Sequence, residues 1–123
     1  MERPGGPGGI GQHRRALGAQ GEDLAARWYE ERGWTVLARN WRCGRLGELD
    51  LVAGRRGVVV VCEVKARATA AFGIPAEAVT PAKQARIRRL AAAWLAQSGA
   101  RGTVRFDVAC VLAGEIEVIE AAF

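Results

Sequence analysis

The apolar positions of the chain follow two periods, and the longer one predicts a helix near the N-terminus. Small and apolar residues recur every three or four positions from Leu17 to Trp28. Gly33 follows this stretch as a C-terminal stop, because glycine readily adopts the left-handed conformation that ends a helix. The pattern therefore predicts a helix over about residues 17–32.

A second helix has a recognisable start and end. Thr80 can cap its N-terminus, Pro81 is favoured in a first turn, and Gly99 lies just beyond the expected end. One side of this helix is apolar and is expected to face the core. The apolar residues on that side are Ile87, Leu90, Ala91 and Trp94.

Five runs rich in β-branched and aromatic residues predict strands. They cover residues 34–40, 48–53, 58–66, 103–112 and 115–121. Gly54–Gly57 is expected to be a four-residue hairpin connection, and residues 41–47 are expected to form a turn-rich segment. The order is helix, three strands, helix, two strands, which indicates one α/β unit.

Length and composition favour a single domain preceded by a tail. Residues 1–15 hold glycine and proline at a density that is unfavourable for a helix or strand, so we expect a flexible tail. Residues 16–123 are long enough to bury a core of their own. The sequence also lacks an apolar run of membrane-spanning length, so a cytoplasmic protein without membrane contact is expected.

The chain carries 18 Lys and Arg against 13 Asp and Glu, for a formal charge of +5. This excess would attract a polyanion such as nucleic acid, although an arginine-rich composition can also reflect a GC-rich genome. The three cysteines are widely spaced and form no C-x-x-C unit, so neither a disulfide framework nor a zinc site is indicated.

The hairpin of residues 48–66 carries charges that an apolar sheet does not need. Side chains alternate across a strand, so Glu63 and Lys65 share one face. An even-numbered connection would place Asp50 and Glu48 on that same face, with one carboxylate opposite Glu63. A divalent cation would offset the repulsion between such acids, and Lys65 beside it could orient and deprotonate a water that attacks a phosphodiester.

The alternative is an ordinary salt-bridged surface, in which the acids pair with Arg55, Arg56 or Arg67. Three features argue against it. Four consecutive valines precede Glu63, so the strand is expected to be buried on both faces, where charges are rare. A second acid lies on the partner strand, and the first helix offers a third acid, Glu22.

These motifs resemble those of a known nuclease superfamily. The order of acid, Asp and E-x-K resembles the PD-(D/E)xK nucleases with their restriction-endonuclease-like fold. More closely, the chain resembles the uncharacterised bacterial YraN-like family, which is related to archaeal Holliday junction resolvases. The stretches that carry this resemblance are "GAQGEDLAARWYEERGWTVLARNWRCGRLGELDLVA", "VVVVCEVKAR", "FG", "AVTPAKQARI" and "RFDVACV".

The resemblance implies a mixed central sheet flanked by helices, in the order αβββαββ. It also implies roles for particular residues: Glu22, Asp50 and Glu63 bind Mg²⁺ or Mn²⁺, and Lys65 acts on the water. Glu48 lies in the family-like "GELD" and is a further metal-ligand candidate. Leu49 replaces the proline that names the superfamily, but the ligand is the carboxylate that follows.

Several basic residues are candidates for binding nucleic acid, DNA rather than RNA. Lys83 and Arg86 lie in the predicted second helix, where a solvated face is the alternative interpretation. The other candidates are Arg39, Arg42 and Arg67.

The resulting hypothesis is a metal-dependent endonuclease that hydrolyses DNA phosphodiester bonds, at branched or otherwise structured DNA. By analogy with resolvases it would be a homodimer, because both strands of a junction are cut. The competing hypothesis is a non-catalytic nucleic-acid-binding or adaptor domain that keeps the nuclease fold.

Overall fold

The computed structural model describes the backbone of residues 9–67 and 79–123, and the side chains from residue 18 onward except those of 67–78. The "FG" stretch of the resemblance, Phe72 and Gly73, lies outside these residues. The elements are α1 (Gly9–Glu31), β1 (Thr35–Cys43), β2 (Gly47–Arg55), β3 (Val58–Arg67), α2 (Pro81–Ser98), β4 (Thr103–Leu112) and β5 (Glu115–Ile119).

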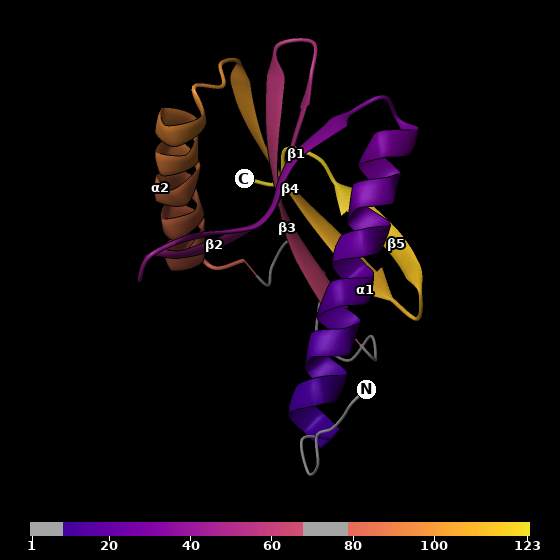
Figure 1. Ribbon diagram of the computed structural model, residues 1–123. Coiled ribbons are helices and arrows are strands. Elements are labelled where there is room, and N and C mark those ends of the chain that lie inside the picture. The colour runs from indigo at the N-terminus through magenta and orange to yellow at the C-terminus, as the bar shows by residue number, and fades with distance from the viewer. Residues whose placement is uncertain (1–8, 68–78) are drawn as a thin grey trace.

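The five strands form one sheet in the order β1-β2-β3-β4-β5. Strands β3 and β4 are parallel and the other neighbours are antiparallel, so the sheet is mixed. The two helices lie on opposite sides of the sheet (Figure 1). This is the arrangement of a restriction-endonuclease-like core, and the predicted α/β class and element order are confirmed.

Local boundaries differ from the prediction most clearly in three places, and β5 also ends at Ile119 and not at residue 121. Helix α1 begins at Gly9, so residues 9–15 are helical and the expected tail is too long. The reason is that glycine is unfavourable but not forbidden in a helix, and residues 12–17 are mostly good helix formers. Strand β1 continues to Cys43 because it pairs with β2 over its whole length.

The third difference is the turn between β2 and β3. Arg55 pairs with Val58, so the connection has two residues and not four. Arg56 and Gly57 both have positive φ, at 49° and 79°, which is the pattern of a type I′ turn. Two-residue connections of this type match the twist of the strands they join, which explains why pairing continues to the end of the hairpin.

Alternation along β3 divides the apolar residues between two cores, one on each side of the sheet. Val59 and Val61 pack in the cluster that contains the apolar side of α2. Val60 and Cys62 pack in the cluster that contains α1, where Tyr29 is fully buried. The predicted burial of β3 on both faces is therefore confirmed from Val59 to Cys62.

Helix α2 has the predicted caps. The Thr80 side chain accepts a hydrogen bond from the Lys83 backbone N–H at 3.2 Å, and Gly99, with φ of 75°, donates to the Leu95 carbonyl. All four residues of the predicted apolar line are buried. These contacts fix the first turn of α2, and so the position of Lys83, above the sheet.

Candidate functional site

The site begins where β2 leaves β3. Pairing between these strands runs from Arg55–Val58 to Leu51–Cys62 and stops there, whereas β2 stays paired with β1 as far as Gly47. Continuing the register by one position places Asp50 opposite Glu63. The acidic residues in the first part of β2 therefore lie beside β3, but no backbone pairing joins the two strands there.

The Asp50 side chain takes over one of the missing backbone contacts. Its Oδ2 accepts a hydrogen bond from the Val64 backbone N–H at 2.9 Å. This bond holds the carboxylate against β3 on the side where Glu63 also lies. The prediction that strand parity brings Asp50 and Glu63 to one face is confirmed.

The proximity of two acids changes the protonation of Asp50. Burial and the charge of Glu63 raise the pKa of Asp50 from its usual 3.8 to about 7, with a smaller contribution from Glu22. The hydrogen bond from Val64 acts in the opposite direction and is outweighed. Around neutral pH the site therefore favours a proton or another cation at Asp50.

Glu63 is 8 % exposed and is held by two lysines. Lys83 Nζ lies 2.6 Å from Glu63 Oε2, and Lys65 Nζ lies 3.6 Å from the same oxygen. Lys83 comes from the first turn of α2, so this ion pair joins the helix to the centre of the sheet. Sequence reasoning identified Lys83 as a basic candidate but not its partner, because nothing in the pattern fixes how α2 is placed over β3.

The two lysines differ in their protonation. Burial and the neighbouring charge of Lys83 lower the pKa of Lys65. Burial would also lower the pKa of Lys83, but the contacts with Glu63 and Lys65 and the charge of Asp50 together outweigh this effect, and the pKa is raised. Lys83 is thus the persistent cation of the pair, and Lys65 is the lysine that loses its proton more readily.

A small hollow of about 250 Å³ opens beside these groups. It lies between the end of β2, β3 and α2, and it is large enough for a few water molecules or a phosphate group. The residues that line it are Gly47, Glu48, Asp50, Glu63, Lys83, Arg86, Ile87 and Leu90. The hollow thus brings together three predicted metal-ligand candidates, Asp50, Glu63 and Glu48. It also contains Arg86, which was predicted to bind nucleic acid.

The predicted acids do not all assemble in the same way. Glu48 lines the hollow, but its Oε1 lies 3.4 Å from Arg42 Nη2. Glu22 influences the pKa of Asp50 from α1 without lining the hollow. Within residues 18–66 and 79–123, no three His, Cys, Asp or Glu side chains form a ready-made metal site.

The other nucleic-acid candidates lie around β1 and at the end of β3. Arg39 pairs with Asp23 of α1 at 2.6 Å, and Arg42 pairs with Glu48. Both guanidinium groups remain partly exposed, at 38 % and 69 % of their side chains. Arg67 ends β3, and its side chain lies outside the described residues.

Asp107 is the fully buried acid of the second hairpin and belongs to a separate network. It receives two hydrogen bonds from Arg105, one from the Tyr29 hydroxyl at 2.6 Å and one from the Ala121 backbone N–H. Arg105 and Asp107 lie two positions apart on β4, so their side chains share one face of the strand and can pair. The Tyr29 contact, 78 positions away along the chain, was not predictable from local pattern.

Comparison with known sequences places these residues in a family. A sequence model of the uncharacterised protein family UPF0102 matches residues 21–111, which include the acidic pair and both lysines. The chain belongs to family UPF0102. This agrees with the resemblance to the YraN-like group.

Several relatives align over most of the chain. A UPF0102 protein of Acidothermus cellulolyticus is 47 % identical over 131 residues, covering 94 % of this chain and 98 % of the relative. A UPF0102 protein of Nocardia farcinica is 54 % identical over 100 residues, covering 80 % and 78 %. In the described part of this UPF0102 chain, no helix is long and apolar enough to cross a membrane.

Proposed function

We propose that this UPF0102 protein is a metal-dependent nuclease whose site is centred on Asp50 and Glu63. The observation that carries the proposal is the placement of these two carboxylates at the end of the β2–β3 ladder. Burial and mutual repulsion raise the pKa of Asp50 to about 7, so two negative charges at this position are unfavourable without a further positive charge. A bound cation is the simplest compensation.

The donor set fits Mg²⁺ or Mn²⁺. Magnesium commonly binds one or two carboxylates, keeps several waters, and completes its shell with substrate phosphate oxygens. Asp50 and Glu63 supply the two carboxylates. Glu48, which lines the hollow, and Glu22, which lies on α1 and does not line it, are the further candidates. The metal would polarise the phosphodiester and lower the pKa of a coordinated water.

Lys65 and Lys83 have separable roles in this proposal. The lowered pKa of Lys65 favours proton transfer from an attacking water, which is the role expected for the lysine of E-x-K. Lys83 keeps its positive charge and lies near the helix N-terminus, where a phosphate is favoured. Arg86 adds a second positive charge to the wall of the same hollow.

Calorimetric titration with Mn²⁺ tests the metal site directly. Wild type is expected to bind Mn²⁺, and Asp50→Asn, which keeps the shape of the side chain but removes its charge, is expected to lose most of that binding. Glu117→Gln is the control, because Glu117 is exposed on β5 and away from the hollow. Equal Mn²⁺ binding by wild type and Asp50→Asn would contradict the proposed site.

The substrate is tested by incubation with linear, nicked, flapped and four-way DNA, and with single-stranded RNA, in Mn²⁺. Cleavage of branched DNA that Asp50→Asn and Lys65→Gln both abolish is the expected result. Sedimentation of the protein with and without a four-way junction tests the proposed homodimer.

One observation favours the non-catalytic alternative. Lys83 and Lys65 already neutralise Glu63 from within the chain, as expected if these charges only join α2 to the sheet. Metal binding without cleavage of any substrate in the panel would support this nucleic-acid-binding or adaptor function.

A further inference from the structure

A second hollow, of about 700 Å³, lies at the other end of β2. It is formed where the C-terminus of α1, the start of β1 and the β2–β3 turn meet. The residues that line it are Arg32, Gly33, Thr35, Leu37, Gly54, Arg55 and Arg56. None of the proposed nuclease residues is among them.

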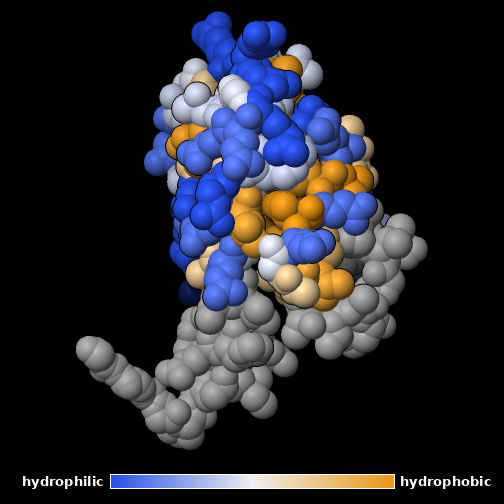
Figure 2. Space-filling model, turned by 90° about the vertical axis from the view of Figure 1, so that its right-hand side faces the viewer, coloured by the Kyte–Doolittle hydropathy of each residue, from blue (hydrophilic) through white to orange (hydrophobic). Residues whose placement is uncertain are grey.

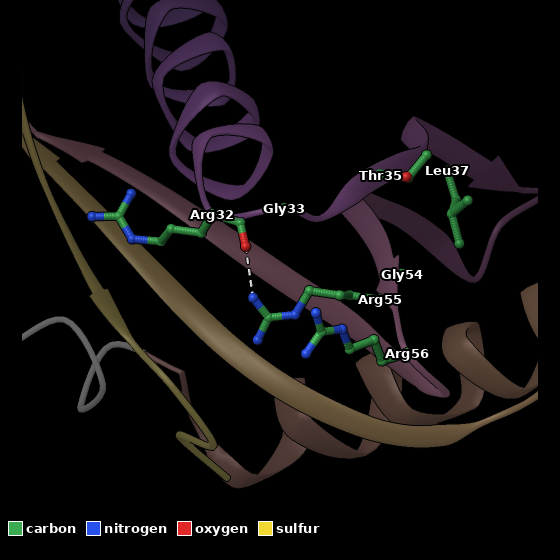
Figure 3. Close-up of a pocket in the computed structure, with 7 residues that line it drawn as sticks. All are labelled: Arg32, Gly33, Thr35, Leu37, Gly54, Arg55 and Arg56. Carbon is green, nitrogen blue, oxygen red and sulfur yellow. Dashed lines mark hydrogen bonds between the residues drawn. The ribbon is translucent and has the colours of Figure 1, made fainter.

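Two guanidinium groups define this hollow. Figure 3 shows Arg55 and Arg56 with their guanidinium groups side by side, whereas the Arg32 side chain points away from them. Among the described residues, no carboxylate lies within ion-pair distance of Arg55 or Arg56. Two adjacent positive charges without an acid between them favour an anion as their partner.

Arg55 is held in place by its surroundings. Its Nη1 donates to the Arg32 carbonyl at 2.6 Å, and its guanidinium lies 4.4 Å from the centre of the Trp34 ring. A guanidinium has five N–H donors, so this arrangement leaves others for a ligand. The fixed position reduces the entropy that would be lost when a ligand binds.

Arg56 occupies a position that its backbone does not favour. Its φ of 49° is left-handed, and the first residue of a type I′ turn is usually Asn, Asp or Gly. An arginine there is unfavourable for the turn, and no hydrogen bond or ion pair of the Arg56 side chain with another described residue offsets this. Strained backbone positions of this kind are common where a ligand binds, so the conformation of Arg56 favours a binding role for its side chain.

The surface around the hollow has the same character. The β2–β3 turn and the C-terminal end of α1 lie at the top of the molecule in Figure 1, and the top of the surface in Figure 2 is strongly hydrophilic. Leu37, with 45 % exposure, supplies an apolar wall next to the charges. Phosphate oxygens beside a sugar would match this combination of guanidinium groups and one apolar side chain.

We propose that Arg55 and Arg56 form a second binding site, which takes phosphate groups of a DNA backbone. Asp50 and Arg55 are five positions apart on β2, or about 17 Å of strand. One phosphate cannot span that distance, so this site is independent of the proposed nuclease centre. It contributes affinity without sequence preference, because it contacts the backbone and not the bases.

The decisive variant is Arg56→Asn. It removes one charge and places a favoured residue in the type I′ turn, so the thermal midpoint should stay the same or rise. Binding of a fluorescein-labelled DNA duplex is measured by anisotropy across a salt titration in EDTA, which prevents metal-dependent cutting. The slope of log affinity against log salt should fall by about 0.9, because one phosphate contact is lost.

Arg27→Gln is the matched control, because Arg27 is exposed on α1 and lines neither hollow. It should leave the slope unchanged. Equal slopes for wild type and Arg56→Asn, an equal loss in Arg27→Gln, or no duplex binding by wild type at low salt would each overturn the site. Full displacement of the duplex from wild type by equimolar inorganic pyrophosphate would also overturn it, in favour of a small phosphate ligand.

The outcome is separate from that of the nuclease proposal. A slope that falls in Arg56→Asn supports the second site even if no DNA in the cleavage panel is cut.

Discussion

Replacing Asp50 by Asn is expected to stabilise the metal-free protein, although Asp50 is the central residue of the proposed site. The two charged carboxylates repel each other, and Asp50 is largely buried. Asparagine keeps an oxygen that can accept the hydrogen bond from the Val64 backbone N–H. The substitution therefore removes the charge and keeps the bond.

The magnitude follows from the pKa of Asp50. A rise from 3.8 to about 7 corresponds to about 4 kcal/mol of lost unfolding free energy once the group is ionised in both states. Residual solvation and the coupling to Glu63 reduce the unfolding free energy that one substitution can recover. We expect Asp50→Asn to gain about 2–4 kcal/mol above pH 7.

The sign of the pH dependence is defined by the same shift. Between pH 3.8 and about 7 the folded protein holds a proton on Asp50 that the unfolded chain has released. This contribution to stability is therefore largest at the acidic end of that window and is lost as pH rises toward 7. Asp50→Asn lacks this titration, so its advantage should shrink as pH falls from 8 toward 4.

Urea unfolding in EDTA at pH 8 and at pH 5 measures both effects. At pH 8 the midpoint of Asp50→Asn should exceed that of wild type by about 1–2 M, given a typical urea slope for a small domain. Glu117→Gln should not change the midpoint. A variant that is no more stable than wild type at pH 8, or an advantage that does not depend on pH, would refute the proposed repulsion.

Two further substitutions test the parts of the fold that position the site. Tyr29→Phe should lose about 1–3 kcal/mol in urea unfolding, because fully buried Asp107 loses the 2.6 Å hydrogen bond from the hydroxyl; an unchanged midpoint would show that Arg105 and Ala121 suffice. Gly21→Val should lose about 1–3 kcal/mol, because even a Cβ there would lie 3.1 Å from the Ala66 Cβ. Gly18→Val is the matched control, because an added Cβ at Gly18 would meet nothing within 4 Å.

Much of the fold followed from local patterns. The caps of α2, its buried side and the strands of both hairpins were predicted because each depends on residues close together in sequence. The pairing of Asp50 with Glu63 was also predictable, since strand parity needs only an even-numbered connection. The connection proved to have two residues and not four, and this left the parity of the two acids unchanged.

The start of α1 was predicted less well. Glycine and proline lower helix propensity, but propensity is a weak signal that favourable neighbours can override. Helix formation from Gly9 shows this limit.

The sequence by itself determined which chemical groups could meet on β2 and β3, because side-chain alternation is a local property of strands. Only the tertiary structure decided what surrounds them. The ion pair of Lys83 with Glu63 depends on how α2 packs across the sheet, and the hollow beside Arg55 depends on where α1 ends against the β2–β3 turn. Such contacts join residues distant in sequence, and their geometry is set by packing of the two cores and not by any short pattern of residues.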